Sequence, residues 1–242
     1  MRHIYIGYDP REDVAYNVAV RSLAYYAKGV RVHPIMDWEM RARKMYWRGY
    51  RVDEKGQMYD DRDGKPFSTQ FAFTRFCVPM LARQMDINDP VLFMDCDVLL
   101  RADVNELFDL WDDTYSVMCV HHDHQPEEIT KMDGVAQTRY FRKNWSSVFL
   151  IHPDKVPLLT TYMVNRSSGA HLHGSCGLRI TRSARYRRNG TISCAGPKRT
   201  RCRIRSWCIS RRESRRCPAM NPMNMPTNGA AMPEAAAPGL DC

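Results

Sequence analysis

The first 35 residues alternate between hydrophobic and polar positions in a way that is typical of a strand, a helix and a second strand. Residues His3 to Tyr8 alternate with a period of two, as in a half-buried strand. A second strand is expected over Val30 to Ile35. Between them, apolar residues recur at three- and four-residue steps, which is the spacing of one helix face: Val14, Ala15, Val18, Ala19, Leu23 and Tyr26. The pattern predicts a β-α-β unit.

The start of this helix has its own sequence signals. Asp9 is a preferred N-cap residue, and Pro10 suits the first helical position, where no backbone N–H is needed. Glu12 stands three residues after Asp9, the spacing of a capping box. We therefore expect the helix to begin at Pro10.

The middle of the chain predicts a polar excursion followed by a second helix. Residues 50–66 are polar and rich in turn formers, so we expect a surface loop. Ser68 and Thr69 can cap a helix that carries Phe73, Phe76 and Leu81. Pro79 is expected to kink or end that helix, because proline lacks the N–H that a helix interior uses.

The segment Val91–Met94 reads as a central strand. It is apolar on both faces, as in a sheet covered by helices on both sides. Asp103 and Glu106 form a second capping box before a short helix, and further strands are expected over Tyr115 to Val120 and Ser147 to Ile151. The predicted fold class is α/β, with a mostly parallel sheet and helices on both of its faces.

Composition is that of a soluble protein. Of the 242 residues, 44% are hydrophobic and 26% are charged, and no apolar run approaches the roughly 18 residues that a membrane-spanning helix needs. The opening residues lack a long apolar region and a small-residue cleavage site, so the expected location is the cytoplasm.

Charge divides the chain in two. Residues 1–177 hold 22 Lys and Arg against 24 Asp and Glu, whereas residues 178–242 hold 14 against 3, a net charge of +11. Five of the nine cysteines also lie in this second segment, at spacings that match no zinc pattern. We therefore expect one globular domain over residues 1–177 and a basic tail over residues 178–242, disordered or not native in sequence.

The strongest chemical signal is Asp95-Cys96-Asp97 at the carboxyl end of the predicted central strand. Two carboxylates at the end of a buried strand are costly without a positive partner, and a divalent cation is the simplest one. Mg2+ and Mn2+ take oxygen ligands and neutralise a diphosphate leaving group. Ligands of open α/β sheets bind at this end of the strands. The alternative is that Asp95 and Asp97 only cap the following turn.

Several segments together resemble one enzyme family. The run V-L-F-M-D-C-D-V-L-L over residues 91–100 is similar to the D-x-D strand of GT-A fold (Rossmann-like) nucleotide-sugar glycosyltransferases, especially those of glycosyltransferase family 8. The opening I-Y-I-G-Y-D-P-R-E, the F-A-F-T-R-F helix and the N-W-S-S-V-F-L-I strand fit the same family, over roughly residues 1–175. The resemblance implies transfer of a sugar from a nucleotide-diphosphate donor, a UDP-sugar, to an acceptor hydroxyl, with Mn2+ or Mg2+ as cofactor.

The resemblance also implies roles for individual residues. Asp95 and Asp97 would hold the metal, and Arg75 would lie near the donor sugar or diphosphate. The first strand and its loop would contact the base and ribose, and the later strand would line the sugar pocket. These two groups are Gly7, Tyr8 and Asp9, and Asn144, Ser146 and Ser147.

Each of these residues also has a purely structural interpretation. Asp9 can be a helix cap without a ligand, and Arg75 can be a surface residue whose stem covers apolar neighbours. Asn144, Ser146 and Ser147 can be ordinary residues at the start of a strand. Two histidine clusters, residues 121–124 and 171–173, resemble metal sites, but neighbouring strand residues point to opposite faces and cannot converge on one ion without a turn.

The basic tail is consistent with a coding sequence read in a shifted frame. GC-favouring codons for Gly177 onward, regrouped by one constant shift, permit LADHEIGALPPEWNYLV from Leu178 and DPELVHFTQGVPSMP over residues 204–218. The codons near Met225 to Ala230 permit ADEWR in the same way. The phrase VHFTQG resembles the late histidine segment that completes the metal site in similar glycosyltransferases. A shifted frame would remove that histidine from this chain.

Two other functions fit parts of the sequence. A nucleotidyltransferase would share the sheet and the acidic pair, but it needs a glycine-rich basic loop after the first strand, where this chain has Gly7-Tyr8-Asp9-Pro10. A nucleic-acid binder would depend wholly on the basic tail, and we expect no specific nucleic-acid partner.

The shifted frame is tested by resequencing the gene across the codons for Gly174 to Leu178. We expect an inserted or deleted base there, because several separated phrases emerge from one constant shift. The same frame in several independent isolates would show that the basic tail is a genuine part of the protein.

Overall fold

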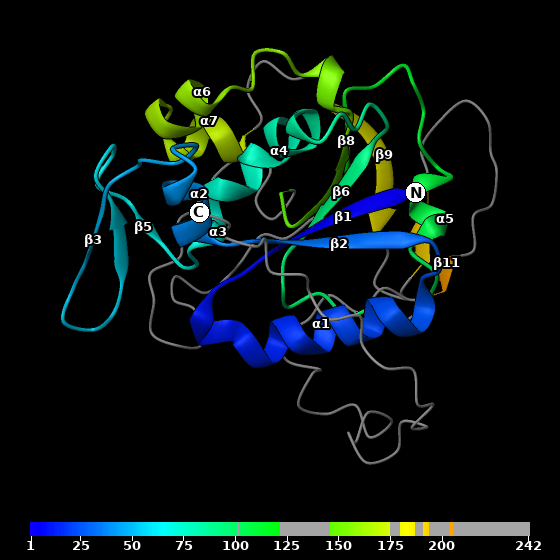
Figure 1. The fold of residues 1–242 in the computed structure, drawn as a ribbon, viewed down its shortest axis with the longest axis horizontal. Coiled ribbons are helices and arrows are strands. Elements are labelled where there is room, and N and C mark those ends of the chain that lie inside the picture. Colours follow the sequence, from blue (N-terminus) through cyan, green and yellow to red (C-terminus); the bar gives the residue numbers. More distant parts are fainter. Residues whose placement is uncertain (101, 122–145, 175–179, 187–190, 194–203, 206–242) are drawn as a thin grey trace, which may run out of the picture. The chain divides into compact units, whose positions relative to one another are not determined.

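The computed structural model describes residues 1–100, 102–121, 146–174, 180–186, 191–193 and 204–205. All of them belong to one compact unit, Met1–Ile209. This unit is an α/β fold, as predicted from the sequence (Figure 1).

An eight-stranded sheet runs through this unit in the order β11-β10-β9-β7-β8-β6-β1-β2. Strand β1 is parallel to β2 and β6, and β7 is parallel to β9, while β8 is antiparallel to both β6 and β7. Strands β8 and β10 therefore oppose the other six, and the sheet is mostly parallel, as predicted. The strands are β1 (Arg2–Gly7), β2 (Val30–Ile35), β6 (Val91–Met94), β7 (Val117–His121), β8 (Val148–Ile151), β9 (Ile180–Tyr186), β10 (Thr191–Ser193) and β11 (Ile204–Arg205).

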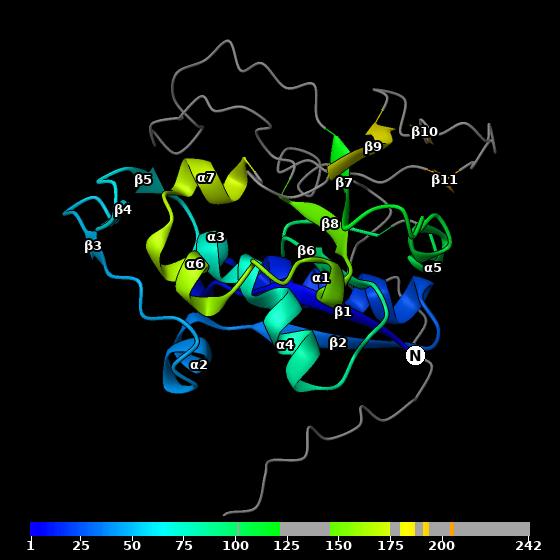
Figure 2. The ribbon, with the colours of Figure 1, turned by 90° about the horizontal axis from the view of Figure 1, so that it is seen from above.

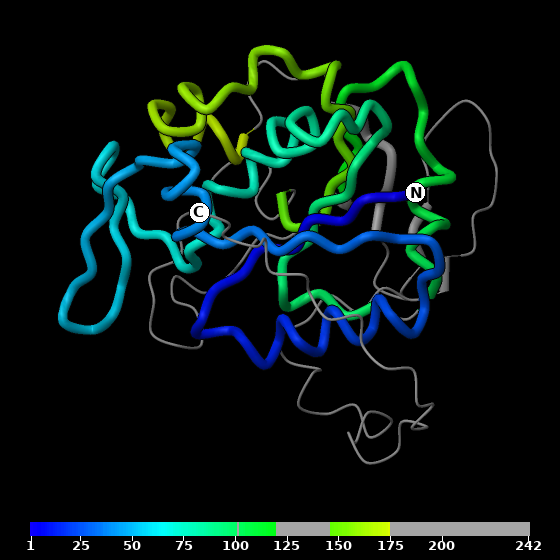
Figure 3. Tube along the Cα trace, in the orientation of Figure 1, coloured from blue at the N-terminus to red at the C-terminus, as the bar shows by residue number. Residues whose placement is uncertain are grey.

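Helices cover both faces of this sheet. Helix α1 lies along one side of β1 and β2, and α4 and α6 lie on the other side (Figures 1 and 2). The chain leaves β1, follows α1 and returns beside β1 as β2, which is the predicted β-α-β unit (Figure 3). The helices are α1 (Asp13–Tyr26), α2 (Asp37–Ala42), α3 (Phe71–Thr74), α4 (Val78–Gln84), α5 (Asn105–Phe108), α6 (Thr161–Arg166) and α7 (Gly169–His173), with 3-10 turns η1 (Pro10–Glu12), η2 (Arg75–Cys77) and η3 (Pro153–Lys155). Among the described residues no helix is long and apolar enough to cross a membrane.

The start of the first helix agrees with the prediction in two respects. Asp9 is the N-cap of η1 and accepts a hydrogen bond from the backbone N–H of Arg11, and Pro10 opens the turn. The carboxylate of Glu12 accepts a hydrogen bond from Cys96 Sγ. The first turn is a 3-10 turn, and α1 proper begins directly after it at Asp13, three residues after the predicted start at Pro10.

The buried stripe of α1 is narrower than predicted. Ala19 and Leu23 are buried, whereas Val14 is 77% exposed and Val18 is 43% exposed. Residues 14 and 18 are one turn apart, on a part of the helix surface that does not meet the sheet. The spacing of apolar residues does not show which of the two neighbouring stripes is buried, because the stripe of Ala19 and Leu23 and the stripe of Val14 and Val18 are both apolar.

Pro79 breaks the second helix, as expected. The segment from Phe71 to Gln84 divides into α3, the 3-10 turn η2 and α4, with Pro79 in the first turn of α4. Proline cannot donate to the carbonyl four residues before it, which belongs to Arg75. The backbone N–H of Val78 bonds to that carbonyl instead, closing a 3-10 turn. The break places Arg75 at the start of this turn.

The predicted polar loop is a small sheet. Strands β3 (Tyr50–Val52), β4 (Met58–Asp60) and β5 (Pro66–Phe67) pair antiparallel across residues 50–67. Gly56 and Gly64 have positive φ angles in the connecting turns, where glycine is favoured. The sequence predicted a surface loop and missed these strands, because each is only two or three residues long, too short for alternation to be visible.

A buried ion pair anchors this small sheet. Arg48 Nε donates to Asp60 Oδ1 at 2.8 Å, and both side chains are 1% exposed. Arg48 Nη1 also donates to the backbone carbonyls of Val164 (2.9 Å) and Ser167 (2.6 Å), at the end of α6. One guanidinium thus joins the small sheet to α6.

Three strands lie in the segment whose composition predicts no regular structure. The backbone of Ile180–Tyr186 pairs with β7 in parallel, and Thr191–Ser193 and Ile204–Arg205 extend the sheet. Ile, Thr and Tyr have high strand propensity, and the edge of β7 offers backbone hydrogen-bonding groups to a further strand. These short strands are the regular structure described within the predicted tail. The boundary at residue 177, the disordered or non-native character of the tail and the shifted frame stay predictions.

Replacing Arg48 tests the anchoring role of the buried pair. The substitution Arg48→Leu leaves the Asp60 carboxylate buried without its partner, so we expect the free energy of unfolding to fall by about 3–5 kcal/mol. Arg43→Leu is the matched control, because Arg43 pairs with Glu39 on an exposed helix surface, and its effect should stay within about 0.5 kcal/mol. Urea unfolding followed by circular dichroism measures both, and equal effects would contradict the assignment.

Candidate functional site

Three strand ends meet at one edge of the sheet. Strands β1 and β6 are parallel neighbours, with Ile6 opposite Met94, so their carboxyl ends share this edge. Strand β8 is antiparallel to β6, with Val148 opposite Met94, so its first residues lie at the same edge. The backbone N–H of Asp95 donates to the carbonyl of Ser147 at 2.9 Å. The topology therefore brings together residues 7–9, 95–97 and 146–147, which are far apart in sequence.

Arg75 reaches this edge from η2 and pairs with Asp95. Arg75 Nη1 lies 2.8 Å from Asp95 Oδ1 and donates to the carbonyl of Ser146 at 2.7 Å. Its Nε donates to the carbonyl of Phe71 at 3.2 Å, and the guanidinium lies over the rings of Phe71 and Phe93. Arg75 is 5% exposed, which excludes the interpretation as a surface residue.

The Asp95 carboxyl is in an unusual environment for an acid. Burial raises the pKa of Asp95 to about 7; Arg75 opposes this rise, while the charge of Asp97 adds to it. The buried Oδ1 atom accepts no hydrogen bond of good geometry from the described residues, although it forms the ion pair with Arg75. A buried carboxylate in this state is suited to a further positive partner.

The two serines of the predicted site lie on either side of this pair. The neighbouring Ser147 lowers the pKa of the Asp95 carboxyl, which favours its charged form. The hydroxyl Oγ of Ser146 is 2.9 Å from Nδ1 of His173, the last residue of α7. Ser146 therefore contacts Arg75 through its carbonyl and His173 through its hydroxyl.

Glu12 and Cys96 add to the site, although the sequence assigned them no chemical role. Cys96 Sγ donates to Glu12 Oε2 at 3.1 Å, and burial with the nearby Glu12 carboxylate raises the pKa of the Cys96 thiol. The negative charge of Glu12 also contributes to the raised pKa of Asp95. The signal that could have found Glu12 is its place in the first turn after β1, beside the end of β6.

The residues at the end of β1 have structural roles. A Cβ atom on Gly7 would come within 2.4 Å of the Phe71 ring, so the packing of α3 against β1 requires glycine here. Tyr8 is partly exposed, and its hydroxyl donates to Asp13 at 3.0 Å.

Asp9 is enclosed by the fold. Its carboxylate pairs with Arg11 (Nη2–Oδ2 2.6 Å) and accepts the backbone N–H of Gln70 at 2.9 Å, and it is 0% exposed. Burial would raise the pKa of Asp9, but these hydrogen bonds lower it overall. The structure shows Asp9 as a helix cap, and its contact with a nucleotide stays a prediction.

Some of the other predicted site residues lie outside the residues that the structure describes. Asn144 and residues 122–124 of the first histidine cluster lie outside the described residues. In the second cluster His171 and His173 lie on α7, and no group of three or more His, Cys, Asp or Glu able to hold a metal is present in the part of the chain that the structure describes.

The donor set still fits a hard cation that shares its ligands with a substrate. Mg2+ is commonly held by one or two carboxylates together with substrate phosphates, and Asp95 and Asp97 supply two carboxylates just after the carboxyl end of β6. Both side chains are partly exposed, and Asp95 carries the buried oxygen without a hydrogen bond.

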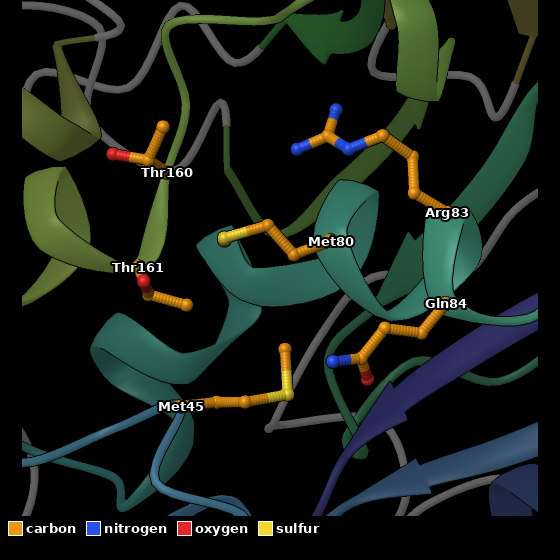
Figure 4. A pocket seen from close by; sticks show the side chains of 6 residues that line it. All are labelled: Met45, Met80, Arg83, Gln84, Thr160 and Thr161. Carbon is orange, nitrogen blue, oxygen red and sulfur yellow. The ribbon is translucent and has the colours of Figure 1, made fainter.

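A shallow pocket of about 400 Å3 lies elsewhere. It is lined by Met45, Met80, Arg83, Gln84, Thr160 and Thr161, at the junction of α4 with the start of α6 (Figure 4). Arg83 is held there by the carbonyls of Pro153 and Leu159. None of the predicted site residues lines this pocket, so it belongs to a different part of the surface.

Comparison with curated proteins finds a relative in a plant. The chain is 44% identical over 174 residues to Protein CDI of Arabidopsis thaliana, an alignment that covers 70% of this chain and 61% of that protein. The chain thus spans about three fifths of the length of this relative. No protein-family model matches the chain.

Solved structures with a similar arrangement are glycosyltransferases. GlyE of Streptococcus pneumoniae aligns with 75% of this chain and 45% of its own, at 14% identity and a TM-score of 0.39. An active-site mutant of LgtC aligns with 74% of this chain and 71% of its own, at 13% identity and a TM-score of 0.39. Mouse xyloside xylosyltransferase 1 aligns with 74% of this chain and 77% of its own, at 13% identity and a TM-score of 0.38.

Proposed function

We propose that this chain is the nucleotide-sugar-binding part of a metal-dependent glycosyltransferase of the family 8 type. The observation that carries the proposal is the buried Asp95–Arg75 pair, with Asp97 two residues on, at the edge where three strand ends meet. Ligands of open α/β sheets bind at the carboxyl ends of the strands. The donor is a nucleotide-diphosphate sugar, with UDP as the nucleotide, and the acceptor is a hydroxyl group.

Asp95 and Asp97 would hold Mn2+ or Mg2+ against the donor diphosphate. A bound divalent cation supplies the positive charge that neutralises a diphosphate leaving group. Arg75 fixes the orientation of the Asp95 carboxylate before the donor binds, through the ion pair between them. A preoriented carboxylate reorganises little during the reaction, which is how such sites lower a barrier.

Arg75 has a second electrostatic task. Its positive charge stands at the edge where the diphosphate would lie, and its guanidinium is fixed by the carbonyls of Phe71 and Ser146. Negative charge that develops on the leaving group is stabilised by such a fixed cation. Tyr8, which is partly exposed at the same edge, is available to the nucleotide.

The shifted reading frame forms part of this proposal. The aligned length of 174 residues is close to the 177 residues before the basic tail, and the relative is longer than the part that aligns. A frame change near residue 177 accounts for both facts. It also removes the late histidine that similar enzymes use as a third metal ligand, so this chain retains the donor edge with two carboxylate ligands.

The binding of UDP with Mn2+ tests the proposed function. The substitution Asp97→Asn removes one carboxylate and leaves the Asp95–Arg75 pair intact. We expect it to weaken Mn2+-dependent UDP binding roughly tenfold or more, equivalent to about 1.4 kcal/mol, in isothermal titration calorimetry. Asp97 is preferred to Asp95 for this test because Asp95→Asn would leave Arg75 buried without its partner.

The matched control is Asp154→Asn, an exposed aspartate in η3 outside the site. It should bind UDP and Mn2+ as the unaltered chain does. Binding that is independent of Mn2+, or that Asp97→Asn leaves unchanged, would overturn the metal-dependent mechanism.

A further inference from the structure

His173 occupies a position that the proposed function does not explain. It is the last residue of α7, and its Nδ1 lies 2.9 Å from the hydroxyl of Ser146. Its ring meets Phe76 edge-on at 5.2 Å and Phe73 at 6.0 Å between centroids. The carbonyl of Ser146 accepts from Arg75, which pairs with Asp95. A continuous chain of contacts therefore runs from His173 to the proposed metal ligand.

We propose that His173 is a positioning residue, which fixes Ser146 and thereby holds the Arg75 guanidinium against Asp95 for binding of the nucleotide diphosphate. This inference rests on the proposed function for its ligand, but the contacts themselves are independent of it. His173 is not placed in contact with substrate or metal.

A neutral imidazole suits this position. Burial and the nearby cations Arg75 and Arg48 lower the pKa of His173 to about 3, so the ring carries no charge at neutral pH. Neutral imidazole offers one donor and one acceptor, enough to hydrogen-bond the Ser146 hydroxyl. A cationic side chain at the same place would repel Arg75 and compete for its partners.

Residues in and next to the small sheet hold the start of α7. Arg48, held by Asp60, donates to the carbonyls of Val164 and Ser167 just before α7 begins. Asp63 accepts the backbone N–H of Gly169, the first residue of α7, at 3.2 Å.

The guanidinium of Arg48 also lies 4.1 Å over the ring of Phe73, which packs beside His173. Helix α7 is thereby tied at its start to the small sheet and at its end to Ser146. Residues 48–63 therefore fix the position of α7, and with it the position of His173.

Two substitutions separate positioning from simple packing. His173→Asn places an amide near the position of Nδ1 and can keep the contact with Ser146. His173→Leu preserves apolar bulk and removes the hydrogen bond. His171→Gln is the control on the same helix, outside the chain of contacts.

The first readout concerns Arg75 itself and needs no ligand. In the unaltered chain the Nε–H signal of Arg75, identified by its loss in Arg75→Lys, should exchange slowly with water, because this group is buried and donates to Phe71. We expect exchange in His173→Leu to be faster by roughly tenfold or more, and exchange in His173→Asn and His171→Gln to stay near the original rate.

The second readout is the affinity for UDP in the presence of Mn2+. We expect His173→Leu to weaken binding roughly tenfold, and His173→Asn to restore most of it. Unchanged Arg75 exchange in His173→Leu, or equal loss of binding in the Asn and Leu variants, would overturn the positioning role. Absence of UDP binding by the unaltered chain, with the Arg75 exchange behaving as expected, would overturn the proposed function and leave the positioning role standing.

Discussion

The ion pair between Arg75 and Asp95 is the interaction around which the rest of this edge is arranged. A carboxylate and a guanidinium that are both largely removed from water lose hydration energy that their mutual attraction restores only when the geometry is good. Here the guanidinium has two backbone carbonyls and two aromatic rings as further partners. Apolar residues often stabilise a fold as well as a buried ion pair does, so this pair is compatible with the proposed role at the sheet edge.

Different local features of the fold position Asp95 and Arg75. The parallel strands β1 and β6 bring Gly7 and Asp95 to one edge, and the reversed direction of β8 delivers Ser146 and Ser147 to the same place. Pro79 converts the preceding turn into a 3-10 turn that begins at Arg75. The absence of a side chain on Gly7 lets Phe71 pack against the strand, and Phe71 then supplies the carbonyl that holds Arg75.

Local sequence signals predicted the strands and helices that form this edge of the sheet. They did not predict the contacts between residues that are distant in sequence. The strand Val91–Met94 and the effect of Pro79 follow from apolar run length and from proline chemistry, and both were predicted correctly. The cap predicted at Asp9 is present, but the contacts of its carboxylate with Gln70 and Arg11 depend on tertiary packing that the local sequence does not show.

The contacts of Glu12 with Cys96 and of His173 with Ser146 join residues 84 and 27 positions apart. The periodicity of hydrophobic residues along the chain does not show which distant residues will be in contact. The small sheet escaped prediction because its strands are only two or three residues long, and the Arg48–Asp60 pair that anchors it joins residues 12 positions apart.

Anomalous diffraction at the manganese edge, from crystals of this chain grown with UDP and MnCl2, tests the central claim most directly. The account predicts one strong manganese peak within coordination distance of the Asp95 and Asp97 carboxylates, with the diphosphate beside it and Arg75 still paired with Asp95. A manganese peak at another place on the protein, or a diphosphate bound away from the ends of β1, β6 and β8, would contradict it.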